Sequence, residues 1–373
     1  MPSLHFFRWT AQLKDAGHEV FWFDVVDGGE KIPRISWVQQ IVGWKYKWNF
    51  QGRYFLKKKL PKLYAFIARF NTRDTATVFE EKLLQIQPDL VHSFALYVAC
   101  TPIIKVMEKH KHLKWIYSSW GSDLFYFQNN PAYLKDIKRV LPRVNFLFTD
   151  CSRDFKIAKT HGFVGEFLGV FPGGGGFPLL EMQSYSLPLE QRKTILIKGF
   201  QGRSGRAITV LKAVQKLKKQ LKAYKIIVFG ADAEVIEYVT ATELVQWNNF
   251  TILGKIAQNE VWQLMGKSLI YIGNSNSDGM PNTLLEAICM DVFPIQSNPG
   301  GVTEEIITQG KNGFLIEDCE DVKQIIKLLL ILFNKLNLIE NAIYFNQQKI
   351  KPKLDRGYTN KQVLKSYLKI SKY

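Results

Sequence analysis

The sequence predicts an α/β protein built from two doubly wound parallel sheets. Short apolar strands alternate with helical patterns along almost the whole chain, which is typical of βαβ units. The pattern stops at the glycine-rich run 171–176, and about fifteen loop-like residues follow before it resumes near residue 194. Two such series in tandem place a ligand cleft between the domains, at the carboxyl ends of the strands.

Four strands are expected before this break and five after it. The first series comprises 18–23, 88–92, 114–118 and 145–149. The second series comprises 194–199, 225–230, 250–254, 268–273 and 292–295. The predicted organisation is a first domain over 1–180, a second domain over 190–345, and a helical tail over 346–373 that crosses back.

The start of the chain departs from this pattern. A helix over Phe7–Ala16, with Gly17 as its C-cap, is expected at once, without the central strand that opens a doubly wound domain. Either the first strand is absent from the first domain, or the reading frame begins upstream of Met1. We favour the second explanation.

Composition excludes several classes of protein. The chain has 373 residues, of which 46% are hydrophobic and 22% charged, so it is not disordered, collagen-like or a coiled coil. Its four cysteines are far apart, which argues against a disulfide scaffold or a cysteine zinc site. Because neither a signal peptide nor a membrane-spanning run is evident, we expect a cytoplasmic protein.

The positive charge is concentrated in two runs without an acidic residue. Residues 31–73 and 191–231 each contain eleven Lys or Arg, whereas the whole chain carries a net charge of +17. The first run also holds ten large aromatic residues, a combination that suits anionic lipid headgroups. Two alternative interpretations of this run are a packed helical pair with its lysines facing solvent and a binding site for single-stranded nucleic acid. We predict contact with the inner membrane surface through 31–73 and no nucleic-acid partner.

The most informative segment runs from Gly273 to Ala287. A strand ends there, a polar loop follows, and a helix capped by Asn282 or Thr283 begins, which makes a site for a phosphate group. Glu286, expected in the first helical turn, accepts the hydroxyl protons of a ribose or only complements the helix dipole. Asp278 in the loop can hold sugar hydroxyls, and Gly279 allows close approach of a ligand.

This segment resembles a known family. The spacing Asp278-x7-Glu286 is similar to the E-x7-E signature of family-4 retaining glycosyltransferases, which have the GT-B fold of two Rossmann-like domains facing a central cleft. Residues 299–304 look like the GGxxE motif of that family, and residues 312–315 look like its NGFL motif. Asp278 departs from the usual glutamate, which puts the sugar preference in doubt.

The resemblance implies a nucleotide-sugar donor as substrate, without cofactor or metal, and a glycan or lipid-linked acceptor of bacterial polysaccharide synthesis. The implied catalytic residues are Asp278, Arg206 and Glu286, with Arg206 favoured over Arg203 as the cation for the diphosphate. The implied donor-binding residues are Arg203, Gly279, Met280, Pro281, Asn282, Thr283, Leu284, Gly300 and Gly301.

Three residues of the first domain are cleft candidates: His92, Trp120 and Asp123. Trp120 stands where the family commonly has a histidine that contacts the donor sugar, so this contact does not carry over. The alternative to an enzyme is a catalytically silent binding or scaffold protein with the same fold.

Overall fold

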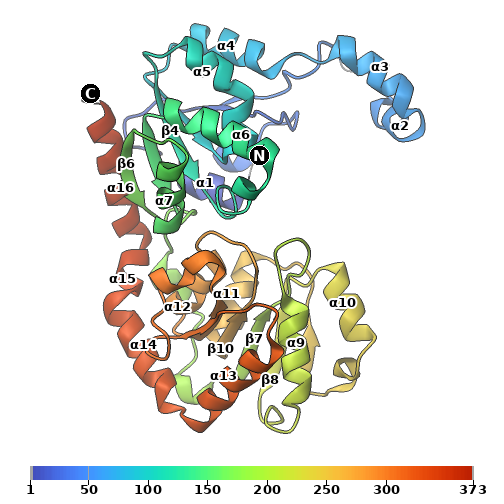
Figure 1. Cartoon of the computed structure of the whole chain (residues 1–373), viewed down its shortest axis with the longest axis vertical. Coiled ribbons are helices and arrows are strands. Elements are labelled where there is room, and N and C mark those ends of the chain that lie inside the picture. The colour runs from blue at the N-terminus through green and yellow to red at the C-terminus, as the bar shows by residue number, and fades with distance from the viewer. Residues whose placement is uncertain (1–2, 49, 372–373) are drawn as a thin grey trace.

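The computed structural model describes residues 3–48 and 50–371. Residues 1–2, 49 and 372–373, which belong to the predicted first domain, the basic first run and the helical tail, lie outside the described residues. The chain forms two α/β bodies, one above the other in Figure 1, and each is built on a parallel sheet. The predicted fold class, α/β with two parallel sheets, is confirmed.

The first domain has a four-stranded parallel sheet in the order β3–β4–β5–β6. Its strands are β3 (Leu90–Phe94), β4 (Lys114–Ser119), β5 (Phe146–Thr149) and β6 (Glu166–Val170). Its helices are α1 (Leu4–Ala11), α4 (Thr75–Ile86), α5 (Ile104–Lys109), α6 (Pro131–Val140) and α7 (Ser152–Thr160). A second, smaller sheet pairs β1 (Phe21–Phe23) with β2 (Gln39–Ile41) in parallel.

The second domain has six parallel strands in the order β12–β11–β10–β7–β8–β9. These strands are β7 (Thr194–Lys198), β8 (Lys225–Phe229), β9 (Phe250–Ile252), β10 (Ser268–Gly273), β11 (Phe293–Ser297) and β12 (Phe314–Ile316). The chain starts at the central strand β7, runs outward to β9, and returns to β10 on the other side of β7. This reversal is the switch point at which doubly wound sheets bind ligands.

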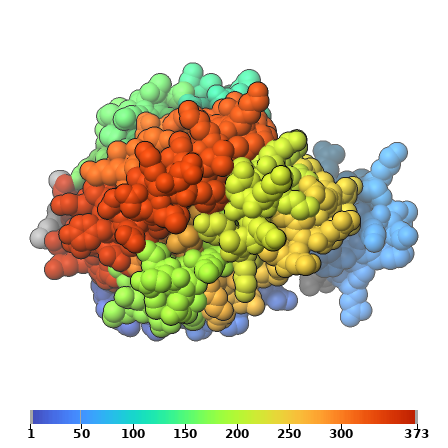
Figure 2. Space-filling model, turned by 90° about the horizontal axis from the view of Figure 1, so that it is seen from below, coloured from blue at the N-terminus to red at the C-terminus, as the bar shows by residue number. Residues whose placement is uncertain are grey.

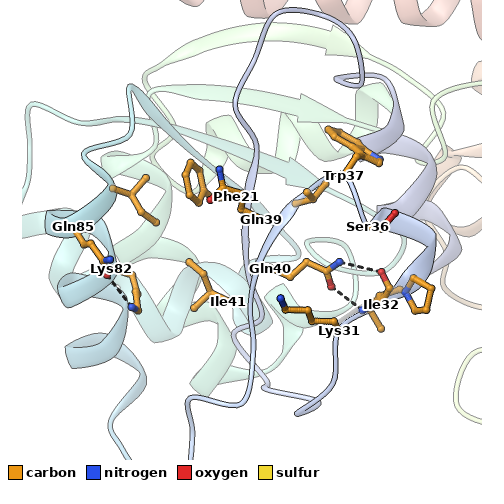
Figure 3. A pocket seen from close by; sticks show the side chains of 13 residues that line it. Phe21, Lys31, Ile32, Ser36, Trp37, Gln39, Gln40, Ile41, Lys82 and Gln85 are labelled. Carbon is orange, nitrogen blue, oxygen red and sulfur yellow. Dashed lines mark hydrogen bonds between the residues drawn. The ribbon is translucent and has the colours of Figure 1, made fainter.

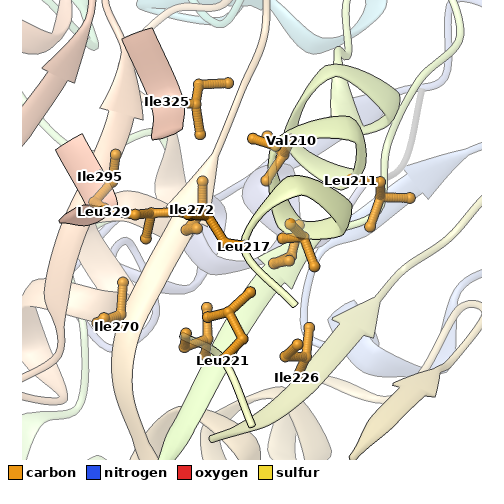
Figure 4. Packing of buried hydrophobic residues seen from close by; sticks show 14 of the residues in the cluster. Val210, Leu211, Leu217, Leu221, Ile226, Ile270, Ile272, Ile295, Ile325 and Leu329 are labelled. Carbon is orange, nitrogen blue, oxygen red and sulfur yellow. The ribbon is translucent and has the colours of Figure 1, made fainter. Parts of the chain in front are cut away.

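Helices cover both faces of the second sheet. They are α9 (Ala207–Lys216), α10 (Ala233–Thr240), α11 (Gln258–Gly266) and α12 (Asn282–Cys289). Figure 4 shows Val210 and Leu211 of α9, and Leu217 beyond it, in the cluster that includes Ile226 and Ile272 of the strands. The other face carries a second cluster that includes Leu284 of α12. Burial on both faces explains why these strands are apolar throughout rather than alternating.

The C-terminal helices return to the first domain. They are α13 (Val322–Asn334), α14 (Asn337–Lys349), α15 (Lys351–Leu354) and α16 (Arg356–Ser371), and α16 runs beside the first domain in Figure 1. Val363, Tyr367 and Ile370 of α16 are buried with Trp9 and Phe148 of the first domain. The Tyr367 hydroxyl lies 2.6 Å from Nδ1 of His92 and accepts a hydrogen bond of 3.3 Å from the Trp9 indole. The last helix is therefore part of the first domain's core.

Two short helices extend away from the first domain. We call α2 (Arg53–Lys59) and α3 (Pro61–Asn71) the basic–aromatic arm. Figures 1 and 2 show it protruding from the body of the molecule. Asn71 is the buried residue of α3, and its side chain pairs with the backbone of Trp48 at 2.9 Å in both directions. The arm is therefore anchored at its base and exposed along its length.

Arg153 of α7 connects the two domains. Its guanidinium donates to the carbonyl oxygens of Pro299 and Asp278, both at 2.7 Å, and forms an ion pair of 2.9 Å with buried Asp154. The carboxylate of Glu305 accepts hydrogen bonds from the backbone N–H groups of Ser152 and Arg153 at the start of α7. One helix end of the first domain is thus capped by the second domain.

All nine predicted strands form, with ends shifted by up to three residues. The sequence missed β2, β6 and β12: β12 is three residues long, and β6 contains Gly169 at φ +131° with a shift in register. The first helix spans Leu4–Ala11 rather than Phe7–Ala16, because Ser3 Oγ accepts from the N–H of Phe6 and so caps an earlier start. Gly17, at φ +79°, lies in the turns that follow this helix.

One further helix was not expected, and the lengths of all helices can be compared with the thickness of a membrane. Helix α8 (Leu179–Gln183) lies in the segment that was expected to be a loop. Among the described residues, every helix is too short or too polar to cross a lipid bilayer.

The contact between α16 and the first sheet yields a prediction. Replacing Tyr367 by Phe leaves the buried groups of His92 and Trp9 without their partner, so we expect a loss of about 1–3 kcal/mol in the free energy of unfolding. Tyr358→Phe on the same helix, where the ring is exposed, is the matched control and should change the stability by less than about 0.5 kcal/mol. Urea unfolding followed by circular dichroism measures both. Equal stabilities would contradict this role.

The Arg153 contacts yield a second prediction. Arg153→Met leaves the buried Asp154 carboxylate without its cation, so we expect a loss of about 3–5 kcal/mol, seen as a lower thermal midpoint. Adding Asp154→Asn should recover part of the loss. Arg139→Met, which breaks the exposed ion pair with Glu108, is the control and should cost about 1 kcal/mol or less. Equal effects at the two arginines would show that burial of the pair is unimportant.

Candidate active site

The switch point of the second sheet brings two polar loops together. The loop after β7 and the loop after β10 form an antiparallel bridge between Gly205 and Ser275. The N–H of Arg206 donates to the Asn274 carbonyl, and the N–H of Asn276 donates to the Ser204 carbonyl, both at 2.9 Å. A doubly wound sheet binds its ligand at this edge, and the first domain lies directly opposite.

Glu286 is buried beside α11. One of its carboxylate oxygens accepts from the Gln258 amide at 2.7 Å and from the Trp262 indole at 3.4 Å. Burial raises the pKa of Glu286 to about 7, although the positive charges of Arg8 and Lys198 oppose this shift. The side chain is therefore poised between its neutral and ionised forms near neutral pH.

The helix that carries Glu286 begins differently from expectation. Pro281 is the N-cap of α12, so neither Asn282 nor Thr283 caps it, and the cap has no side-chain hydrogen bond. Glu286 is the fifth residue of the helix and therefore lies beyond the first turn. The sequence missed this start because proline has no N–H and suits the edge of a helix as well as a polar cap does.

Asp278 lies partly buried in the loop after β10. Burial raises the pKa of its carboxyl group, and Lys198 is the largest of the charges that oppose this. Lys198, the last residue of β7, thus acts electrostatically on both Asp278 and Glu286. Sequence reasoning placed Lys198 in the basic run but did not select it. Its position at the carboxyl end of the central strand was the signal that could have found it.

The two predicted diphosphate cations point in different directions. Arg203 lies over the rings of Tyr126 and Phe127 of the first domain, 4.0 and 5.6 Å from their centroids. Arg206 instead forms an ion pair with Glu320 and donates to the Gly205 carbonyl. The geometry therefore favours Arg203 over Arg206 as the arginine that faces the cleft, opposite to the order predicted from sequence.

The remaining predicted donor-binding residues separate into core and interdomain positions. Met280 and Leu284 are buried in the hydrophobic cluster under α12. A Cβ at Gly279 would lie 2.4 Å from Asp150 Oδ2 and 2.7 Å from the N–H nitrogen of Gly121. In this structure Gly279 is therefore required for close approach of the first domain.

Gly300 and Gly301 form a tight turn against the first domain. Both have positive φ, +63° and +77°. A Cβ at Gly300 would lie 2.3 Å from the ring of Phe125, and a Cβ at Gly301 would lie 2.7 Å from Glu304. Gly300 therefore permits the interdomain contact that Arg153 stabilises, and Gly301 permits the turn itself.

The cleft candidates of the first domain have structural partners. His92 does not line the cleft, because its ring nitrogens contact the Tyr367 and Ser118 hydroxyls, and burial lowers its pKa to about 3. Trp120 stacks on Phe94 with centroids 4.6 Å apart.

Asp123 is also held within the first domain. It accepts from the N–H of Leu96 at 2.7 Å and from the Tyr117 hydroxyl at 2.5 Å. Burial raises its pKa to about 7.

Two side chains of α1 face the second domain and were not found from sequence. The Arg8 guanidinium lies 5.7 Å from the centroid of the Trp262 ring, and the charge of Glu286 acts on it. Nδ1 of His5 is buried and has no hydrogen-bond partner among the residues that the structure describes. Burial, Arg8 and Lys198 all lower the pKa of His5, which keeps the imidazole neutral.

One group of potential metal ligands occurs in the described part of the chain. Oxygen and sulfur atoms of Asp150, Cys151 and Asp154 lie within 4.8 Å of one another. Their polar atoms are used by the protein: Asp154 binds Arg153 and Ser119, and Asp150 accepts from the N–H of Gly121. Burial raises the pKa of both carboxyl groups and of the Cys151 thiol. The cluster is better explained as interdomain structure than as a cation site.

Two surface hollows differ in size, and the larger of them lies away from the cleft. Figure 3 shows it against the β1–β2 sheet, with a volume of about 580 Å³. Its lining includes Lys31 and Lys82, and the Gln40 side chain is tied to the backbone of Ile32. A smaller hollow of about 230 Å³ lies at the ends of β10, β11 and β12, between Ser275 and Asp318. Only the smaller one adjoins the switch-point loops.

Comparison with known proteins agrees with this geometry. Residues 181–349 match the family model described as glycosyl transferases group 1. A search of curated proteins found no match. Among solved structures, the chain is similar to a glycosyltransferase from Rickettsia africae ESF-5, with a TM-score of 0.68 and 15% identity over 99% of this chain and 94% of that chain.

Two other solved structures are also similar. The sucrose-phosphate synthase of Thermosynechococcus elongatus has a TM-score of 0.70 and 14% identity over 96% of this chain and 91% of that chain. The pneumococcal O-GlcNAc transferase GtfA, solved in complex with UDP and GlcNAc, has a TM-score of 0.61 and 14% identity over 79% of this chain but 60% of its own length. At these identities the likeness concerns the fold.

The family match covers β7, β10 and α12, and with them Lys198, Arg203, Asp278 and Glu286. The second domain thus matches the group 1 glycosyl transferases over residues 181–349, and nearly the whole chain shares the GT-B fold with the similar solved structures.

Proposed function

We propose that the protein is a retaining glycosyltransferase that uses a nucleotide diphosphate sugar. The observation that supports this best is the position of Lys198, whose charge acts on both Asp278 and Glu286 at the switch point of the second sheet. A cation whose charge acts on two carboxylates suits a ligand that has a diphosphate between two hydroxyl-rich sugars. Such a ligand joins a ribose to a transferable sugar.

Each side chain has a role in this proposal. Glu286 accepts hydrogen bonds from the ribose hydroxyls, and Asp278 accepts from hydroxyls of the transferred sugar. Lys198 and Arg203 neutralise the diphosphate, which gains negative charge as it leaves. Fixed cations in a water-poor cleft stabilise that charge without reorganising, so they lower the barrier to bond cleavage.

The acceptor approaches from the first domain. Its hydroxyl attacks the sugar on the face from which the diphosphate departs, and the departing phosphate takes the hydroxyl proton, so the configuration is retained. We propose a glycan or lipid-linked acceptor of a bacterial surface polysaccharide. The solved complex of GtfA with UDP makes UDP-sugars the first donors to test.

The pKa of Glu286 makes the proposal testable by pH. Because only the ionised carboxylate of Glu286 can accept strong hydrogen bonds from both ribose hydroxyls, and its pKa is about 7, donor affinity should fall as the pH drops from 8 to 6. Protonation of this one group can raise the Kd of the donor by at most about tenfold for each pH unit below the pKa. Glu286→Gln should bind weakly and without this pH dependence, whereas Asp123→Asn, which removes the other carboxyl titrating near 7, should keep it.

Calorimetry with UDP-, GDP- and ADP-sugars measures these affinities, and release of nucleoside diphosphate measures turnover. A wild type that binds a donor equally at pH 6 and 8 would contradict the role of Glu286. No binding of any of the three sugar nucleotides would favour a catalytically silent scaffold.

We further propose that the basic–aromatic arm docks on the inner, anionic face of a membrane. Its large apolar side chains are exposed, among them Tyr54 (78%), Phe55 (64%) and Phe66 (64%). Between residues 53 and 71 there are six Lys or Arg and no acidic residue. Exposed aromatics beside unopposed cations match the headgroup region of an anionic bilayer.

Two variants of the arm test this proposal. Replacing Lys57, Lys58 and Lys59 by Gln removes about 1 kcal/mol per charge, so binding to phosphatidylglycerol vesicles should weaken roughly a hundredfold. Phe55→Ser with Phe66→Ser should also weaken binding, whereas Tyr344→Ser with Tyr358→Ser, exposed aromatics of α14 and α16, should not. Vesicle co-sedimentation measures all three. Unchanged binding in the arm variants, tight oligonucleotide binding, or arm-dependent dimers would each contradict a lipid partner.

A further inference from the structure

The loop Gly173–Gly176 lies where α1, the start of α16 and the cleft meet. A Cβ at Gly174 would be 3.5 Å from both Arg8 Cδ and His5 Nδ1. A Cβ at Gly176 would be 3.0 Å from the Cα of Arg356. Gly175 and Gly176 have φ of +69° and +82°. The run of glycine thus brings backbone into contact with side chains from both ends of the chain.

The backbone donors of this loop are largely unused. All four glycines are buried, and the N–H of Gly175 donates to the Pro172 carbonyl at 2.8 Å. Within residues 3–48 and 50–371, no acceptor is recorded for the N–H groups of Gly173, Gly174 and Gly176. Buried backbone donors without acceptors are rare in proteins. Several unpaired N–H groups in one tight loop are typical of a concave site for an anion.

Arg8 and Arg356 adjoin the loop, and the charge of Arg34 acts on both of them. Arg8 is half-buried, and Arg34 and Arg356 are exposed. The Arg34 guanidinium lies 5.7 Å from the ring centroid of Phe7, the neighbour of Arg8. In the described part of the chain, none of the three forms an ion pair within 4.0 Å; Glu181, Asp355 and Glu286 act on them only from a distance. A planar guanidinium group can bind two phosphate oxygens at once, so three guanidinium groups suit a doubly charged phosphate.

The cluster adjoins the donor site through Arg8, whose charge acts on Glu286, but it is carried by other elements of the fold. Lys198 and Arg203 belong to the second domain, whereas Arg8 and Arg34 belong to the first, and Arg356 begins the helix that packs on the first domain. In a two-domain cleft, the domain opposite the donor holds the acceptor. An anion held here would therefore belong to the acceptor.

We propose that the Gly173–Gly176 loop, with Arg8, Arg34 and Arg356, binds a phosphate group of the acceptor substrate. This inference rests on the proposed function, because it takes the second domain as the donor side. The phosphate belongs either to a small phosphorylated acceptor or to a lipid headgroup, and the chemistry of recognition is the same for both. Nδ1 of His5, buried and without a partner among the described residues, lies against the loop and accepts a hydrogen bond from a hydroxyl next to that phosphate.

Calorimetric titration of the full chain with inorganic phosphate and, separately, with UDP tests the inference. Arg34→Gln with Arg356→Gln should weaken phosphate binding about tenfold or more, because two of the three cationic forks are lost, and leave UDP binding within about twofold. The matched control, Lys31→Gln with Lys361→Gln, removes two exposed charges from the same segments and should change neither affinity. Gly174→Ala keeps every charge and adds a methyl group at ordinary contact distance, so it should weaken phosphate binding with the fold intact.

The outcomes separate this inference from the proposed function. Equal phosphate affinity in the wild type and the arginine variant, or complete displacement of phosphate by UDP, would overturn the acceptor site. If the wild type binds phosphate but does not bind UDP, the assignment of the second domain as the donor side is overturned instead. Sedimentation with phosphatidic acid vesicles identifies the source: loss in the arginine variant supports a lipid headgroup, and loss confined to free phosphate supports a small acceptor.

Discussion

Burial of charge at the interdomain contact is the constraint on which the rest of the structure depends. Arg153 reaches from α7 to carbonyl oxygens of the second domain and is paired with Asp154, so neither charge is left alone in a dry environment. Removing charged groups from water is favourable only when hydrogen bonds and an opposite charge replace the lost hydration. These contacts hold the two domains at the spacing seen in this structure.

The same spacing explains the glycines that line the contact. Gly279 and Gly300 have no side chain, and a Cβ at either would overlap Asp150 or Phe125 of the first domain. From the sequence, these two glycines were expected to bind a ligand, yet in this structure they allow the two domains to approach each other closely. Close approach in turn brings Arg203 over Tyr126 and Arg8 beside Trp262, so cationic side chains of each domain extend toward the other.

The distribution of cations gives the cleft two chemically different sides. Lys198 and Arg203 belong to the side that we assign to the donor, and the arginines around the glycine loop belong to the side that we assign to the acceptor. Both substrates of the proposed reaction are then anchored by anionic groups away from the reacting carbon. Binding energy from such remote groups can orient the reacting atoms, which is a large part of catalysis. The basic–aromatic arm extends from the acceptor side, so a membrane partner would position the same domain.

Local patterns were enough to predict much of this protein. Strand alternation, the break near residue 171 and the loop–helix segment around Asp278 and Glu286 depend on neighbours in sequence, and they predicted the fold class and the family. Contacts between distant residues left no such mark. His92 was expected in the cleft, but Tyr367 covers it, and Arg206 was preferred although Glu320 pairs with it. Lys198 meets Asp278 and Glu286 because the sheet reverses at β7, and Arg8 meets Arg356 because the last helix returns to the first domain. Periodicity and composition determine which elements form, whereas packing across hundreds of residues decides which charges face one another.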